Sequence, residues 1–323
     1  MIAVVGPTGI GKGEVAVALA RWIPAEIVVV DSMQVYRGMD LGTGKLDPSI
    51  RSGIPHHGLD LVDPEEEFHV ARYIQGMAPT VQAIQKRGCT PLLVGGSGLY
   101  MKALLDGLCP APGKDPMLRE QLFEEGRQKG PEALYARLQR VDSMSATRIH
   151  PNDLRRVVRA LEVFLVSGKP LSVWHRQTIP SVEKDDIFLI GLTCSRDLLY
   201  RRIENRVDRW VASRWLKEAE RLHRRTLSMT AREALGYREL FDYLEGRTDL
   251  ENAIRLIKRN TRRYAKRQLA WFRSETRIQW IDVGNRTPET VAQLIMQDVI
   301  TGSDDGVTSP PYGTRPTRQR PLL

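Results

Sequence analysis

Short apolar runs rich in β-branched residues recur along this chain of 323 residues, and each is followed by a turn and then by helical spacing. Such runs are typical of strands buried on both faces. Their alternation with helical segments predicts a parallel sheet covered by helices on both sides. The predicted strands are residues 2–6, 26–31, 57–63, 90–96, 186–194 and 278–283. The sequence therefore predicts an α/β fold.

The alternation of strand and helix breaks between about residues 110 and 180, where proline and glycine separate helical segments. We interpret this stretch as a helical domain inserted between two strands of the sheet. The α/β core then comprises residues 1–109 and 181–300. Residues 301–323 lack apolar periodicity and are rich in proline, glycine and polar residues, so we expect a disordered tail.

Composition excludes several other classes of protein. The sequence shows no charged-then-apolar leader, and no apolar stretch approaches the ~18 residues that indicate a membrane helix. Cys89, Cys109 and Cys194 form no C-x-x-C pair, so neither a disulfide framework nor a zinc site is indicated. We expect a cytoplasmic protein that does not bind membranes.

The formal net charge of +9 is concentrated in two segments. Residues 253–277 carry nine Lys and Arg against one acid, and residues 196–225 carry ten against five. A solvated basic helix face is the usual explanation for such a run. A helix with almost no acids to neutralise it, however, favours contact with a phosphate backbone. The sequence therefore predicts a nucleic-acid partner.

The first predicted strand leads into a glycine-rich segment, GPTGIGKGEV, which opens a helical run. The spacing G-x-x-x-x-G-K at this position is typical of a phosphate-binding loop, whose amides hold an anion at a helix N-terminus. The eighth position is Gly13, where a hydroxyl that ligates Mg²⁺ usually stands. We predict phosphate binding with weakened metal affinity, and the sequence identifies no metal ligand. The predicted phosphate-binding residues are Gly6, Pro7, Thr8, Gly9, Ile10, Gly11, Lys12 and Gly13.

Two further strand ends carry polar residues. Asp31 follows the second predicted strand, and Ser97 follows the fourth within VGGSGLY. The carboxyl ends of parallel strands share one edge of a sheet, so both residues should lie beside the phosphate loop. Asp31 could serve only as a helix cap or turn residue. Alternatively, it is a general base next to a bound diphosphate.

A phosphate loop with a large basic surface is compatible with a helicase, a nucleic-acid kinase, or a transferase whose leaving group is diphosphate. An ATPase would need an apolar strand ending in adjacent acids, to hold Mg²⁺ and activate water. None of the predicted strands ends in this way.

Ordered motifs then connect the chain to a known family. They are GPTGIGK, DSMQVYRGMDLGTGK, PHHGLDLVDP, LLVGGSGLYMKALLDGL, RIHPNDLRRVVRALEVFLVSGKPLS, RRIENRVDRW, ALGYREL and NTRRYAKRQLAWFR. In this order the chain resembles the tRNA dimethylallyltransferase family from about residue 2 to residue 283. Gly13 departs from the Thr or Ser of that family, Ser97 from its usual Thr, and Gly44 from its usual Ala.

The resemblance implies transfer of a dimethylallyl group from dimethylallyl diphosphate to N6 of the adenosine just 3′ of the anticodon. The product would be N6-dimethylallyladenosine, in tRNAs that read codons beginning with U. It also implies a P-loop core with an inserted helical domain that contacts tRNA, Mg²⁺ as cofactor, and a monomer that binds the tRNA anticodon stem-loop. Two alternatives remain open. One is an adenylate isopentenyltransferase that uses a free nucleotide, and the other is a tRNA-binding relative made inactive by Gly13.

The resemblance also assigns residues to roles. Asp31 is the expected general base, while Lys12, Ser97 and Arg206 hold the leaving diphosphate. The residues expected to contact tRNA are Asp31, Ser32, Met33, Gln34, Ser97, Arg119, Leu154, Arg155, Arg156, Val157, Val158, Arg232, Tyr237, Arg262, Arg263, Lys266 and Arg267.

Overall fold

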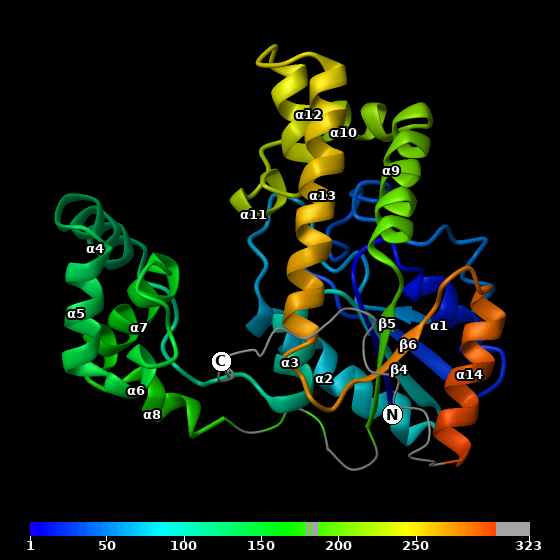
Figure 1. Cartoon of the computed structure of the whole chain (residues 1–323), viewed down its shortest axis with the longest axis horizontal. Coiled ribbons are helices and arrows are strands. Elements are labelled where there is room, and N and C mark those ends of the chain that lie inside the picture. Colours follow the sequence, from blue (N-terminus) through cyan, green and yellow to red (C-terminus); the bar gives the residue numbers. More distant parts are fainter. Residues whose placement is uncertain (179, 181, 183–186, 302–323) are drawn as a thin grey trace. The chain divides into compact units, whose positions relative to one another are not determined.

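The computed structural model describes residues 1–178, 180, 182 and 187–301, and it contains a six-stranded parallel sheet (Figure 1). The order of the strands is β3-β2-β4-β1-β5-β6, so the predicted α/β fold is confirmed. The chain places β4 and β5 on either side of β1, although neither is its neighbour in sequence. The strands are β1 (Ile2–Val5), β2 (Ala25–Val29), β3 (His56–His57), β4 (Thr90–Gly95), β5 (Phe188–Thr193) and β6 (Gln279–Asp282).

The four inner strands, β1, β2, β4 and β5, are buried on both faces of the sheet. Consecutive side chains of a strand point to opposite faces, so each strand contributes to two cores. Ala3 and Val5 of β1 belong to one cluster of buried hydrophobic residues, and Ile2 and Val4 belong to another. The first cluster includes side chains of α2 and α3, and the second includes side chains of α1 and α14. These helices are α1 (Lys12–Ala20), α2 (Val70–Lys86), α3 (Gly98–Asp106) and α14 (Pro288–Thr301).

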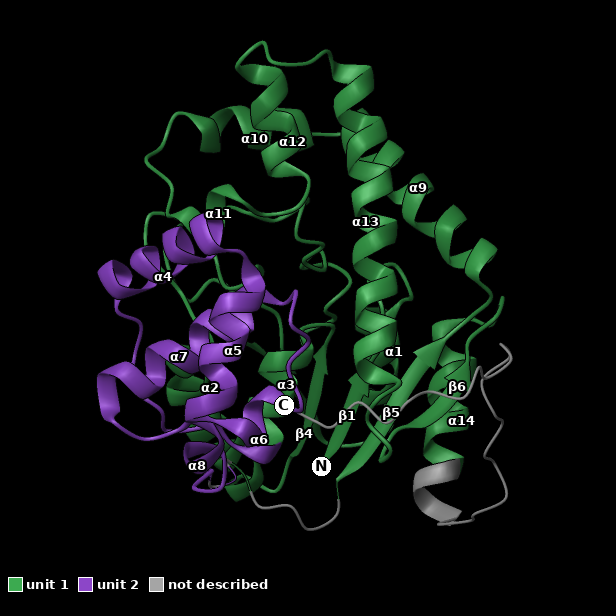
Figure 2. Cartoon of the chain, turned by 60° about the vertical axis from the view of Figure 1, so that its left-hand side comes forward, with its two compact units in different colours: residues 1–105, 182–313 green, residues 106–181, 314–323 purple. Residues whose placement is uncertain are grey.

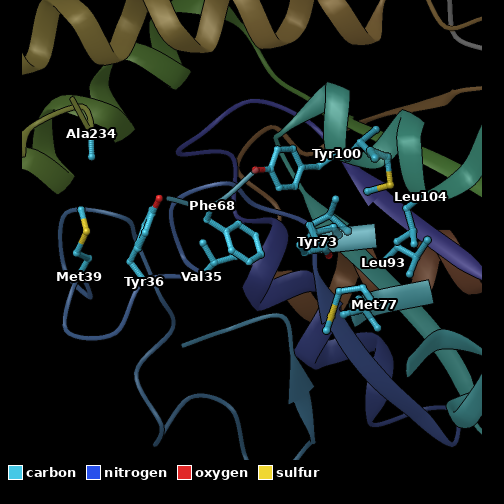
Figure 3. Packing of buried hydrophobic residues seen from close by; sticks show 14 of the residues in the cluster. Val35, Tyr36, Met39, Phe68, Tyr73, Met77, Leu93, Tyr100, Leu104 and Ala234 are labelled. Atoms are coloured by element: carbon cyan, nitrogen blue, oxygen red, sulfur yellow. The ribbon is translucent and has the colours of Figure 1, made fainter. Parts of the chain in front are cut away.

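The first cluster packs α2 and α3 against the sheet. Figure 3 shows Tyr73 and Met77 of α2 beside Leu93 of β4 and beside Tyr100 and Leu104 of α3. The rings of Tyr73 and Tyr100 have their centroids 5.1 Å apart. Such aromatic pairs add to the stabilisation that burial of apolar surface provides.

The predicted strand at residues 57–63 is wrong beyond its first residue. The chain leaves the sheet at Gly58, which has φ of +84° and where a Cβ would lie 2.5 Å from the carbonyl oxygen of Val29. Asp60 also has a positive φ, of 52°. Two left-handed residues within three positions cannot continue an extended strand. The apolar spacing that suggested a strand reflects packing of a turn segment instead.

The chain divides into two compact units, coloured separately in Figure 2. The described residues of the first are 1–105, 182 and 187–301, and those of the second are 106–178 and 180. The predicted helical stretch 110–180 overlaps the second unit. Apart from Thr301, the predicted tail lies outside the described residues. The helices of the second unit are α4 (Pro116–Lys129), α5 (Pro131–Val141), α6 (Ser143–Ala146), α7 (Leu154–Ser167) and α8 (Leu171–His175).

The second unit has a hydrophobic core of its own, in which one carboxylate is buried. Glu162 of α7 accepts hydrogen bonds from Arg119 at 2.6 Å and from Arg159 at 2.7 Å. Burial alone would raise the pKa of Glu162, but these hydrogen bonds lower it. A buried carboxylate that is paired in this way stays ionised and holds α4 against α7.

A run of helices separates β5 from β6 in the first unit. The last of them, α13, carries the basic stretch, and one of its faces is buried through Ala253, Ile257, Ala265 and Phe272. Within the described residues, none of the helices combines the length and the apolar character that a bilayer span requires. The helices of this run are α9 (Arg196–Ala212), α10 (Trp215–His223), α11 (Met229–Arg232), α12 (Tyr237–Leu244) and α13 (Leu250–Phe272).

Candidate active site

The loop between β1 and α1 has a backbone conformation that only glycine adopts easily. Gly6, Gly9 and Gly11 have φ values of 147°, 83° and 101°. A Cβ at Gly6 would also lie 2.7 Å from the carbonyl oxygen of Leu192. Because α1 begins at Lys12, the amides of its first turn have no partners within the helix and are available to an anion.

Lys12 brings a half-buried cation to this loop. Its ammonium donates a hydrogen bond to the carbonyl oxygen of Pro7 at 2.9 Å. Burial lowers the pKa of Lys12 to about 8, although the nearby charge of Asp31 acts in the opposite direction. A partly desolvated cation gains from a neighbouring anion.

Asp31 follows β2 and has the turn role, one of the two roles that the sequence left open. Its Oδ1 accepts hydrogen bonds from the backbone amides of Met33 at 2.8 Å and Gln34 at 3.3 Å, which closes a turn. Burial raises the pKa of Asp31, although those hydrogen bonds and the charge of Lys12 act against it. Neither hydrogen bond uses Oδ2. A carboxylate oxygen with raised proton affinity is therefore available to take a proton.

The end of β4 is linked to the phosphate loop by a side chain of α13. Gln268 accepts a hydrogen bond from the amide of Thr8 at 2.8 Å and donates one to the carbonyl oxygen of Gly96 at 2.9 Å. Ser97 is almost fully buried, and its Oγ accepts a hydrogen bond from the amide of Ser32 at 3.2 Å. The ends of β1, β2 and β4 are thereby held together at the carboxyl edge of the sheet.

Arg206 of α9 supplies a second cation beside the loop. Its Nη2 donates a hydrogen bond to Oγ1 of Thr8 at 2.8 Å, and its guanidinium carbon lies 4.5 Å from the ring centroid of Trp210. Burial lowers the pKa of Arg206 to about 10. Its Nε is buried and has no hydrogen-bond partner among the described residues. The guanidinium plane is therefore fixed while one of its N–H groups remains available.

A cavity of about 1440 Å³ brings these groups together. Its lining includes Thr8–Gly13, Asp31–Gln34, Arg206 and Arg267, all predicted from the sequence, and also Tyr264. Burial raises the pKa of Tyr264 to about 12, and the charge of Asp31 contributes to this shift. The predicted residues Gly6, Pro7 and Ser97 do not line the cavity and support its walls instead.

The space beside Gly13 is filled by a neighbouring side chain. A Cβ at Gly13 would lie 2.8 Å from Cδ1 of Leu46. Among the described residues, no group of three or more His, Cys, Asp or Glu side chains is arranged to hold a metal ion. The residues present therefore do not fit an Mg²⁺ site with a protein hydroxyl at the usual position of the phosphate loop.

Several of the residues predicted to contact tRNA are exposed cations. Arg263, Lys266 and Arg267 are exposed on α13, Arg155 and Arg156 on α7, and Arg232 on α11. Two of these exposed cations have ion-pair partners within the protein, Arg156 with Asp153 and Arg232 with Glu245. Two less exposed cations are paired as well. Arg119 pairs with the buried Glu162, and Arg262 pairs with Glu204. Leu154 is half-buried.

Three of the predicted tRNA contacts are wrong. Val157 and Val158 lie in the core of the second unit, and the side chain of Tyr237 is fully buried in the first. Tyr237 instead donates a hydrogen bond to the buried carboxylate of Glu218, which also accepts one from the amide of Leu41. These three side chains are unavailable to RNA because they pack against the protein itself.

Comparison with known proteins agrees with this geometry. The chain matches the family described as "IPP transferase" over residues 34–275 and the family described as "Isopentenyl transferase" over residues 1–52. It is 46% identical over 304 residues to the tRNA dimethylallyltransferase of Symbiobacterium thermophilum, covering 92% of this chain and 95% of that one. It is 45% identical over 284 residues to that of Geobacter sulfurreducens, covering 87% and 91%.

Solved structures show the same fold. The full-length tRNA isopentenylpyrophosphate transferase of Bacillus halodurans is 38% identical, with a TM-score of 0.67, covering 93% of this chain and 96% of that one. A eukaryotic dimethylallyltransferase acting on tRNA is 28% identical, with a TM-score of 0.78, covering 94% and 79%. The similarity extends over nearly the whole chain and includes the loop, the sheet edge and the basic helix. This chain therefore belongs to the IPP transferase family, the family of the tRNA dimethylallyltransferases.

Proposed function

We propose that this protein transfers a dimethylallyl group from dimethylallyl diphosphate to N6 of the adenosine just 3′ of the tRNA anticodon. The observation that carries the proposal is the placement of the Asp31 carboxylate and two half-buried cations, Lys12 and Arg206, around a single cavity. That combination suits a substitution in which a proton is removed at one point while an anionic leaving group forms at another.

The reaction balances as a single displacement at carbon. The lone pair on N6 forms the new bond to C1 of the dimethylallyl group, and the bond from C1 to the diphosphate oxygen breaks. The proton that N6 loses passes to Asp31. An exocyclic adenine amine is a weak nucleophile because its lone pair is delocalised into the ring, so removal of this proton assists the attack.

The departing diphosphate gains negative charge as its bond to carbon breaks. We assign its stabilisation to the amides at the start of α1, to Lys12 and to Arg206. Groups that are fixed in position before the reaction stabilise developing charge without a cost of reorganisation. Ser97 acts indirectly, because its hydroxyl holds the turn that carries Asp31.

The RNA must present an adenine that has left the stacked anticodon loop, at a cost of a few kcal/mol. We propose that Asp31, Ser32, Met33 and Gln34 border this base, since all four line the cavity. Exposed cations contact the RNA backbone: Arg263, Lys266 and Arg267 of the first unit, and Arg155 and Arg156 of the second. We expect the protein to act as a monomer, with Mg²⁺ bound to the diphosphate.

The direct test uses labelled dimethylallyl diphosphate and an anticodon stem-loop with three consecutive adenosines. We expect the label to pass to the adenosine next to the anticodon, and not to the same stem-loop carrying guanosine there. Absence of transfer at saturating Mg²⁺, with RNA binding retained, would indicate an inactive tRNA-binding relative.

An adenylate isopentenyltransferase is the second candidate, favoured by the match of residues 1–52 to the isopentenyl transferase family. Competition between the stem-loop and AMP separates the two activities. We expect AMP neither to accept the label nor to inhibit transfer to RNA. Labelling of AMP in preference to RNA would contradict the proposal. Transfer of phosphate from labelled ATP to the RNA would identify a kinase instead.

The lowered pKa of Lys12 predicts a pH dependence of donor binding. Below about 8 the ammonium is charged and attracts the diphosphate, and as the pH rises through this value the free protein loses that charge. Linkage to one proton makes the affinity fall by up to about tenfold per pH unit. Calorimetry with an unreactive thio analogue of the donor in metal-free buffer measures this decline. Lys12→Arg should remove the decline because a guanidinium stays charged, so an equal decline in that variant would exclude Lys12.

A further inference from the structure

Gly13 is the second residue of α1, and its backbone does not require glycine. It is absent from the residues with positive φ, in contrast to Gly6, Gly9 and Gly11 of the same loop. Glycine within a helix is unfavourable relative to alanine. Something other than backbone conformation must therefore account for the lack of a side chain at this position.

The side chain of Leu46 occupies the space that a residue at position 13 would need. A Cβ at Gly13 would lie 2.8 Å from Cδ1, 3.0 Å from Cγ and 3.3 Å from Cδ2 of Leu46. Because all three atoms belong to one side chain, Leu46 would have to shift to admit a Cβ at this position. Positions 13 and 46 therefore form a pair in which one residue is large and the other has no side chain.

Leu46 is fixed in this place by its surroundings. Its carbonyl oxygen accepts a hydrogen bond from Nε of Arg51 at 2.9 Å, and its side chain packs against the buried cluster on the α1 face of the sheet. The preceding residue, Lys45, is almost fully buried and pairs with Asp40 and Asp60. Displacing Leu46 would expose apolar surface and disturb this anchored segment.

We infer that Leu46 takes the place of a metal-ligating side chain at position 13, so that a divalent ion reaches this site only through the diphosphate that carries it. This inference rests on the proposed function for the identity of the anion. The charge that the protein itself contributes then comes from Lys12 and Arg206, both of which face the cavity. Within the described residues no alternative cluster of acidic, His or Cys side chains offers a replacement site.

Binding of Mn²⁺ to the protein, saturated with the unreactive thio analogue of the donor, tests this inference without catalysis. Electron paramagnetic resonance of free Mn²⁺ gives the affinity. In the wild-type protein we expect an affinity no higher than that of Mn²⁺ for the free analogue in solution. An affinity about tenfold higher would require a protein ligand, and would overturn the inference.

Substitutions at both positions test the pairing of Gly13 with Leu46. In Gly13→Ser/Leu46→Ala the hydroxyl has room, and we expect Mn²⁺ to bind about tenfold more tightly than to the wild type. The matched control Gly13→Ala/Leu46→Ala has the same space without a hydroxyl and should show no gain. Gly13→Ser alone should gain much less than the double variant. An equal gain would show that Leu46 does not block the position.

Affinity for the analogue without metal separates this inference from the proposed function. The affinity of each variant for the analogue is first measured in the presence of chelator, so that Mn²⁺ binding by variant and wild type is compared at equal occupancy by the analogue. If the wild type fails to bind the analogue at all, the proposed donor site is wrong, and the inference falls with it. If binding is normal but the wild type already ligates Mn²⁺, only the inference is wrong.

Discussion

Replacing Asp31 by Asn lowers the rate of prenyl transfer at saturating substrates by about 10²- to 10⁴-fold, the range expected when a positioned general base is lost. Asparagine retains an oxygen that can accept the amide hydrogen bonds of Met33 and Gln34, so the turn at the end of β2 is kept. It cannot take the proton that N6 must lose. The effect should therefore appear in kcat, measured with labelled donor and the anticodon stem-loop.

The control for Asp31→Asn is Asp47→Asn. Asp47 also lines the cavity, but it is exposed, and its carboxylate serves a local turn through Ser49. We expect this variant to transfer at a rate close to that of the wild type. If Asp31→Asn instead weakened RNA binding by the same factor as transfer, Asp31 would have a binding role and not a chemical one.

The raised pKa of Asp31 gives the same prediction a second readout. The base is active when ionised, so kcat should rise with pH through a pKa above the ordinary value of an aspartate. Asp31→Asn should lack this acid limb and retain only the residual rate. A limb that persists unchanged in the variant would assign the titration to another group.

The polar residues at the ends of the predicted strands explain why much of this site could be predicted from the sequence. Parallel strands that end in polar residues must bring them to one edge, whatever the details of packing. For this reason three features could be assigned to one edge of the sheet from the sequence alone. They are the phosphate loop, Asp31 and Ser97.

The features that could not be predicted from the sequence depend on contacts between distant segments or on local backbone geometry. Gln268 was not among the predicted site residues, and its hydrogen bond to Thr8 spans 260 positions. The occupation of the space beside Gly13 by Leu46 has no periodic signal at all. In the same way, alternation of apolar residues after β3 gave no warning that Gly58 turns the chain out of the sheet.

Motif resemblance alone did not separate exposed residues from buried ones. It selected whole blocks, and within a helical block some residues necessarily face the core. Val157 and Val158 follow Arg155 and Arg156 directly, yet the helix turns the valines inward and leaves the arginines exposed. Applying helical spacing to α7 would have separated the two pairs.

Replacing Arg206 by Lys lowers kcat/KM for the donor by about 10²- to 10³-fold, the loss typical when one preorganised donor to a developing anion is removed. The reason is geometry as well as charge. Lysine keeps a positive charge, but it cannot both hydrogen-bond to Thr8 and present a second, planar N–H to the diphosphate. Arg201→Lys, an exposed position on the same helix outside the cavity, is the matched control and should change little.

The stack of Arg206 on Trp210 predicts how that loss is divided between binding and chemistry. Trp210→Phe keeps an aromatic face under the guanidinium and should retain most of the donor affinity, whereas Trp210→Leu frees the guanidinium to rotate and should raise KM for the donor. Neither change should alter the affinity for RNA, measured by fluorescence anisotropy of a labelled stem-loop. If Trp210→Leu weakens RNA binding and leaves KM for the donor unchanged, Trp210 stacks on a base instead. Arg206 would then owe its orientation to its hydrogen bond with Thr8.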